Sequence, residues 1–141
     1  MNKTYLKLSL DLDLDFVLIA ITASLKDYTL GHKINKILNF DFVRIEDHEA
    51  YFNIDEEPLE FSRFHYFIEE GEVDFFLVSN RNREGFLIPE MKKVDYFMII
   101  QQYISKEDLR EILAKLKLIP EVQVAAQIDP HKLKSKENLI M

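Results

Sequence analysis

The last third of the chain holds the feature that most constrains its fold. Residues 94–101 are almost entirely apolar and predict a buried strand. Ser105, with Asp108 three residues later, resembles a capping box and predicts the start of a helix, which Pro120 cannot continue. Residues 122–128 then alternate between apolar and small or polar side chains, as in a half-buried strand. Strand, helix and strand within about 35 residues predict a right-handed crossover between two parallel strands.

The rest of the chain shows weaker patterns of the same kinds. The run 14–24 has neither a helical nor a strand period, so a buried helix and a buried strand both remain open, and we favour the helix. A helix capped by Ser24 or Asp27 should reach Leu38. The other expected elements are strands at 4–12 and 40–46, a hairpin of 59–68 with 73–79, a polar loop at 80–85 and a short strand at 86–88.

These segments predict one α+β domain over residues 1–141, with an antiparallel or mixed sheet and helices on one face. A chain of 141 residues with 48% apolar and 30% charged residues has the composition of a single packed globule. Only three glycines occur, so most of the chain should lie in regular elements.

Composition also limits the function. The chain has no cysteine, which excludes disulfides, cysteine-bound metals and thiol nucleophiles. Residues 1–80 carry 7 Lys and Arg against 16 Asp and Glu, and such an acidic surface repels nucleic acid. The longest apolar run is far too short for a membrane span, and no secretory signal precedes it. We therefore expect a cytoplasmic protein that binds neither nucleic acid nor membrane; its oligomeric state stays open.

Common catalytic and metal-binding patterns are missing from the sequence. The glycines at 31, 71 and 85 are too far apart to build a phosphate-binding loop. Asp11, Asp13 and Asp15 have the spacing that opens a calcium loop, but the glycine and the closing glutamate of that loop are replaced. The cluster at 46–49 is more typical of a hydrated loop. We expect no cofactor and no metal.

Residues 88–97 carry the most informative candidates. Asp95 shares a strand face with apolar side chains, and a buried carboxylate must be paired or hydrogen-bonded. Glu90 follows Pro89 in a rigid turn and is expected nearby. The simplest interpretation is structural, with Asp95 bound to backbone N–H groups and Glu90 paired with a lysine. A ligand or partner site and acid–base catalysis remain as alternatives. The expected cationic partners are Arg81, Arg83, Lys132, Lys134 and Lys136.

The C-terminal segment 129–141 is expected to dock back on the domain. After an Asp-Pro turn it offers the apolar anchors Leu133, Leu139 and Ile140. Lys134 and Lys136 would then share one side if the segment is extended. A mobile tail with solvated lysines is the alternative.

Two resemblances follow from these residues. Ile88-Pro89-Glu90, three residues and then Val94-Asp95-Tyr96 match the pattern of the bacterial IPExxxVDY family, which residues 133–140 also resemble. That resemblance implies a bacterial source and carries no established activity or catalytic residue. The unit at 94–128 looks like half of a ferredoxin-like domain, as in the ACT amino-acid sensors. The candidate binding residues are Glu90, Asp95, Tyr96, Arg81, Lys134, Lys136 and Asn138.

Three functions remain open from the sequence. We favour a non-catalytic interaction or regulatory module with an unidentified protein partner, formed around Glu90, Asp95 and the C-terminal segment. The alternatives are an ACT-like metabolite-sensing domain and a small-metabolite enzyme that uses Asp95 or Glu90.

Overall fold

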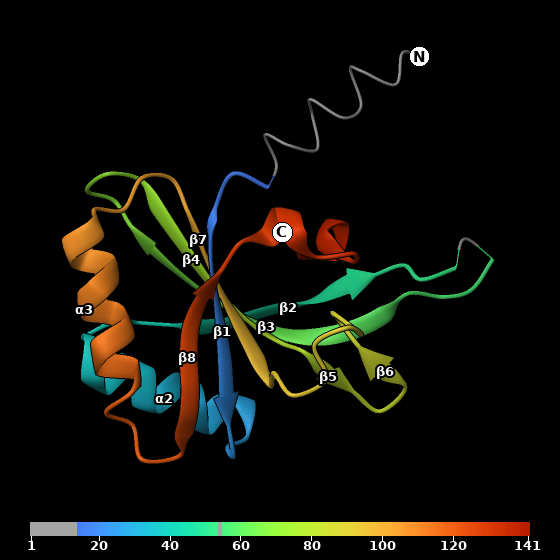
Figure 1. Ribbon diagram of the computed structural model, residues 1–141, viewed down its shortest axis with the longest axis horizontal. Coiled ribbons are helices and arrows are strands. Elements are labelled where there is room, and N and C mark those ends of the chain that lie inside the picture. The colour runs from blue at the N-terminus through green and yellow to red at the C-terminus, as the bar shows by residue number, and fades with distance from the viewer. Residues whose placement is uncertain (1–13, 54) are drawn as a thin grey trace, which may run out of the picture.

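A computed structural model of the chain describes residues 14–53 and 55–141 (Figure 1). They form a six-stranded sheet in the order β2-β3-β4-β7-β1-β8 and a small two-stranded sheet of β5 and β6. Every neighbouring pair of strands is antiparallel. The elements are β1 (Val17–Ala23), α2 (Asp27–Leu38), β2 (Val43–Ala50), β3 (Leu59–Ile68), β4 (Val73–Ser79), β5 (Arg81–Asn82), β6 (Gly85–Phe86), β7 (Tyr96–Gln101), α3 (Lys106–Leu116), β8 (Val122–Ile128), and the 3₁₀ turns η1 (Pro130–Lys132) and η2 (Lys136–Leu139).

The predicted α+β class with helices on one face is confirmed. Helices α2 and α3 lie on the same face of the sheet in Figure 1, and their buried residues share one core cluster with side chains from β1, β4 and β7. The predicted cap of α3 is present, because the Ser105 hydroxyl accepts a hydrogen bond from the backbone N–H of Asp108 at 3.1 Å. Neither α2 nor α3, the helices of the described residues, is long and apolar enough to cross a membrane.

The helix favoured for residues 14–24 is wrong, because this segment contains strand β1. β1 lies between β7 and β8, and a hydrophobic core covers each of its two faces. Ile19 and Ile21 point into the core beneath the helices, whereas Leu18 and Ala20 point into a second core on the opposite face. A strand that is buried on both faces shows no alternation of apolar and polar residues, so its period cannot be read from the sequence.

The prediction that β7 and β8 are parallel strands is correct, but the expectation that they pair with each other is wrong. β7 and β8 run parallel, since β1 is antiparallel to both, but β1 separates them. This arrangement resembles the split β-α-β unit of ferredoxin-like folds. The strand expected at 40–46 instead begins at Val43 and ends at Ala50, and the loop expected at 80–85 contains β5 and the start of β6. The strand expected at 4–12 lies outside the described residues.

The second face of the sheet is covered by irregular segments rather than helices. The core on this face combines side chains of β1, β4 and β7 with Leu87, Ile88 and Val94 from the β6–β7 connection. Leu139, from the C-terminal segment 129–141, is fully buried in the same core. The C-terminal segment therefore lies against the sheet, next to the connection that carries most of the candidate residues.

Candidate functional site

Asp95 is held at the start of β7 by two different partners. Its Oδ2 accepts a hydrogen bond from the backbone N–H of Ala23 at 2.8 Å, and its Oδ1 accepts one from Arg81 Nε at 2.6 Å. Arg81 also donates from Nη2 to the carbonyl of Lys92 at 3.0 Å. The Asp95 side chain is only 18% exposed, so these contacts neutralise a largely buried carboxylate. Of the cations expected from the sequence, Arg81 is the one that binds Asp95.

Tyr96 points to the opposite face from Asp95, as neighbouring residues of a strand must. Its ring belongs to the core beneath the helices, and its hydroxyl donates a hydrogen bond to the carbonyl of Leu25. Burial, together with the negative charges of Asp27 and Asp95, raises the pKa of Tyr96 to about 12. The hydroxyl therefore remains a proton donor, and Tyr96 does not share a site with Asp95.

Glu90 binds Ser135 in the C-terminal segment. Its Oε2 accepts the Ser135 backbone N–H at 2.8 Å, and its Oε1 accepts the Ser135 hydroxyl at 2.8 Å. Burial alone would raise the pKa of Glu90, but these hydrogen bonds and others from backbone N–H groups lower it on balance. The predicted pairing of Glu90 with a lysine is therefore wrong. Within the described residues, the side chains of Lys134 and Lys136 form no ion pair.

Asn138 fixes the C-terminal segment at a second point. Its side-chain amide donates to the carbonyl of Leu87 at 2.9 Å, and its own carbonyl lies 2.7 Å from His48 Nε2. Because a carbonyl oxygen can only accept, His48 carries its proton on Nε2. Burial lowers the pKa of His48, an effect that the Asn138 carbonyl partly offsets, so the ring is neutral near pH 7.

Sequence patterns did not point to the central role of Asn80. Its side chain is fully buried and makes three hydrogen bonds across the β6–β7 connection. The amide group donates to the carbonyls of Met91 at 2.9 Å and Val94 at 2.8 Å, and Oδ1 accepts the N–H of Ile88 at 2.8 Å. Asn80 thus shapes the connection that presents Glu90 and Asp95. Its sequence neighbours are polar, so the pattern indicated only a loop.

A groove adjoins this scaffold, between the β2–β3 loop and the β5–β6 hairpin. It consists of two adjoining hollows of about 670 and 390 Å³ that share Glu57, Leu59 and Glu84. We call it the acidic groove. Its lining residues are Glu49, Tyr51, Phe52, Asn53, Glu56, Glu57, Pro58, Leu59, Glu60, Asn82, Arg83, Glu84, Gly85, Phe86 and Pro89.

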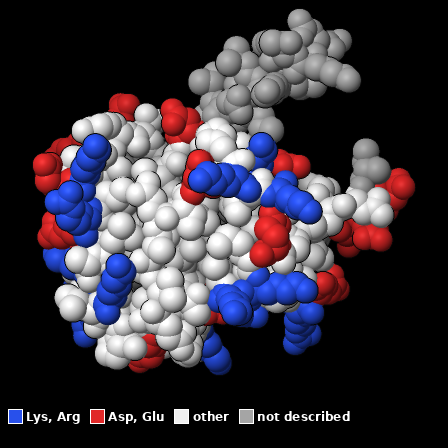
Figure 2. All heavy atoms as spheres, in the orientation of Figure 1, with Lys and Arg blue, Asp and Glu red and all other residues white. Residues whose placement is uncertain are grey.

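The acidic groove combines unpaired carboxylates with exposed aromatic rings. Its lining includes five glutamates and a single arginine, Arg83. None of the five forms an ion pair in the described part of the chain. Tyr51 is 63% exposed and Phe52 is 46% exposed. Figure 2 shows acidic side chains gathered on the β2–β3 loop, which projects at the right edge of the molecule.

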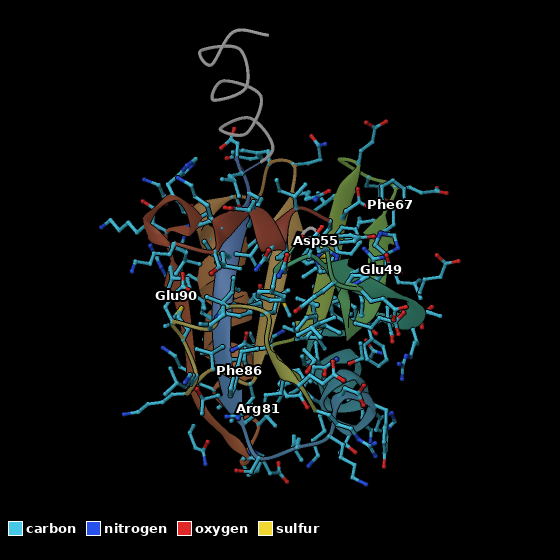
Figure 3. All side chains as sticks on the ribbon, turned by 90° about the vertical axis from the view of Figure 1, so that its right-hand side faces the viewer. Glu49, Asp55, Phe67, Arg81, Phe86 and Glu90 are labelled. Atoms are coloured by element: carbon cyan, nitrogen blue, oxygen red, sulfur yellow. The ribbon has the colours of Figure 1, made fainter. Side chains whose placement is uncertain are left out.

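Two of the candidate residues from the sequence, Arg81 and Asp95, support one wall of the acidic groove. The Arg81 guanidinium carbon lies 5.2 Å from the centre of the Phe86 ring, while Arg81 also binds Asp95. Figure 3 shows Arg81 and Phe86 close together on the β5–β6 hairpin. Asn82 ties the same hairpin to β3 by donating to the carbonyl of Glu60. The sequence therefore pointed to two residues behind this wall, Arg81 and Asp95, and missed the aromatic and acidic residues that line the groove.

Among residues 14–53 and 55–141, no group of three or more His, Asp or Glu side chains could hold a metal ion. A comparison of the chain with models of known protein families gave no match, and neither did a comparison with curated proteins.

Proposed function

We propose that this chain is a non-catalytic protein-interaction module whose acidic groove binds an extended, basic and partly apolar segment of a partner protein. The observation that carries the proposal is the excess of unpaired carboxylates around exposed aromatic rings. Five glutamates against one arginine favour a cationic partner. Tyr51 and Phe52 offer exposed rings to aliphatic side chains and to the cations themselves, and half-buried Phe86 also lines the groove.

The hydrogen bonds that Asp95 and Glu90 accept favour a binding function over catalysis. Each oxygen of Asp95 and Glu90 already accepts a hydrogen bond from the protein. A general acid or base must instead reach a substrate proton. The contacts of Asp95 and Glu90 span distant parts of the chain, which supports a role in holding the surface rigid. Rigidity lowers the entropy cost when a flexible partner segment binds.

A defined peptide pair tests the proposal. The probe is a fluorescent peptide of alternating lysine and phenylalanine, and its counterpart carries glutamate in place of lysine. We expect only the lysine peptide to bind, with an affinity that falls as salt is raised, because the charges are solvent-exposed. The combined variant Glu56→Lys, Glu57→Lys and Glu84→Lys should weaken binding at least about tenfold.

Two controls separate the acidic groove from general attraction to an acidic protein. Glu69→Lys, Glu107→Lys and Glu137→Lys change the net charge equally at exposed positions outside the groove, and this variant should keep most of its affinity. Tyr51→Ser with Phe52→Ser keeps every charge and should still weaken binding. Equal losses in the two charge variants, or no loss in the aromatic variant, would refute the groove as the binding surface.

A further inference from the structure

The two edges of the six-stranded sheet differ in their protection against pairing with another strand. Edge strand β2 contains four charged residues, and its pairing with β3 shifts register between Ile45 and His48. Charges and register irregularities are the usual devices that block an open edge. Edge strand β8, Val-Gln-Val-Ala-Ala-Gln-Ile, contains no charge, proline or glycine. β8 therefore lacks the charges that protect β2, and its own register shift with β1 affects only its start.

β8 is also accessible. Within the described residues it pairs only with β1, so alternate backbone N–H and C=O groups point away from the sheet without a strand partner. Val124 is 49% exposed, and Ala126 is exposed as well. A register shift opposite Thr22 and Ala23 affects the start of β8, so the regular part is 124–128.

The regular part of β8 is complementary to itself. In a two-fold antiparallel pairing centred on Ala126, Val124 faces Ile128 of the second copy and Ala126 faces its equivalent. Val124, Ala126 and Ile128 are every second residue of the strand, so they lie on one face of the sheet. This is the face opposite the helices, where Ile128 packs against the second core. No like charges meet within the paired residues, and small side chains at the centre allow close approach.

We infer that β8 pairs with β8 of a second copy of this chain, joining two sheets into one across a two-fold axis. An isologous contact of this kind uses the same surface on both copies and leaves no unmatched edge between them. β8 lies at the opposite edge of the sheet from β2, whose loop forms the acidic groove. The pairing is thus independent of the proposed partner site and leaves that site open in both copies.

The first test measures mass in solution by sedimentation of the full chain at increasing concentration. We expect a species of twice 16.8 kDa. Ala126→Lys brings two ammonium groups together across the axis and should return the protein to a single-chain mass with an unchanged circular dichroism spectrum. Val43→Lys is the matched control, because Val43 is exposed on the other edge strand. A single-chain mass at every concentration, or a dimer that survives Ala126→Lys, would overturn the inference.

The second test uses the absence of cysteine from the chain. Ala126→Cys introduces one thiol at the proposed axis, where directly opposed Cβ atoms approach within about 5 Å and a disulfide can form. We expect rapid disulfide-linked dimers under mild oxidation, and none from Val43→Cys. If the Ala126→Cys variant stays monomeric with a thiol protected from alkylation, another part of the same chain covers β8 and the inference fails.

Discussion

The carboxylate of Glu90 holds the C-terminal segment at Ser135, which lies 45 positions further along the chain. Both oxygens are used, one on the Ser135 N–H and one on its hydroxyl, each at 2.8 Å. Together with the Asn138–Leu87 and His48–Asn138 contacts, this pair anchors a segment whose Leu139 completes the second core. The strength of this anchor and of the scaffold around it can be measured directly.

Replacing Glu90 with glutamine should loosen the C-terminal segment. One charge-assisted hydrogen bond becomes neutral and the other is lost, at a cost of about 1 kcal/mol of unfolding free energy. Hydrogen exchange should show faster exchange of amides in residues 133–141. Glu137→Gln removes the same charge from an exposed position in that segment and should leave exchange unchanged. Identical exchange in the two variants would contradict the anchor.

Replacing Asp95 with alanine should destabilise the fold more strongly. The change leaves the Ala23 N–H and the Arg81 guanidinium without their partner, at a cost of about 2–3 kcal/mol in urea unfolding. Asp47→Ala breaks the more exposed pair with Arg44 and should cost about 0.5 kcal/mol or less. Equal losses would mean that the Arg81–Asp95 pair contributes no more than a surface ion pair.

Asn80→Ala should be among the most damaging single substitutions. It leaves the carbonyl of Val94 and the N–H of Ile88 without their Asn80 partner and removes one of the two hydrogen bonds to the carbonyl of Met91, at a cost of about 3 kcal/mol. Thermal unfolding should report the loss, with Asn53→Ala, at an exposed loop position, as the reference. A melting temperature within a degree or so of wild type would show that water replaces these bonds.

His48 should make stability fall in mild acid. Its pKa is lowered in the folded protein, so the unfolded chain binds the proton more readily, and unfolding free energy decreases as pH drops below about 6.5. The lowered pKa of Glu90 acts in the same direction at lower pH. His48→Gln can still donate to the Asn138 carbonyl and should flatten the dependence below about pH 6.5. Urea unfolding at a series of pH values below about 6.5 measures this dependence in wild type and variant.

The fold was predictable where local signals decide the structure. The Ser105–Asp108 cap, the apolar stripe of α3 and the β3–β4 hairpin with Gly71 in its turn all depend on residues close in sequence. β1 was not predictable, because its buried position between β7 and β8 comes from strands more than 70 residues away. The order of the strands in the sheet was not predictable for the same reason, because no residue near β7 or β8 in sequence indicates that β1 lies between them.

The candidate site shows the same division. The sequence predicted that Asp95 must be paired with a cation or hydrogen-bonded to backbone N–H groups, and Arg81 was among the expected partners. The Glu90–Ser135 contact was not foreseen, because a neutral residue satisfies that carboxylate through geometry that only the docked C-terminal segment provides. The acidic groove brings together residues from the segments 49–53, 56–60 and 82–89, each of which resembles an ordinary polar stretch by itself.

The interrupted ladder of β2 has a consequence for how many copies can associate. If two chains join through β8, the outer margins of the combined sheet are both β2, where charges and the slip between Ile45 and His48 oppose further addition. Association would then end at a closed pair instead of growing into a fibre. Each of the two outer β2 edges would lie next to one acidic groove. A partner with two basic segments could then bind both grooves at once, with higher avidity than a partner with one such segment.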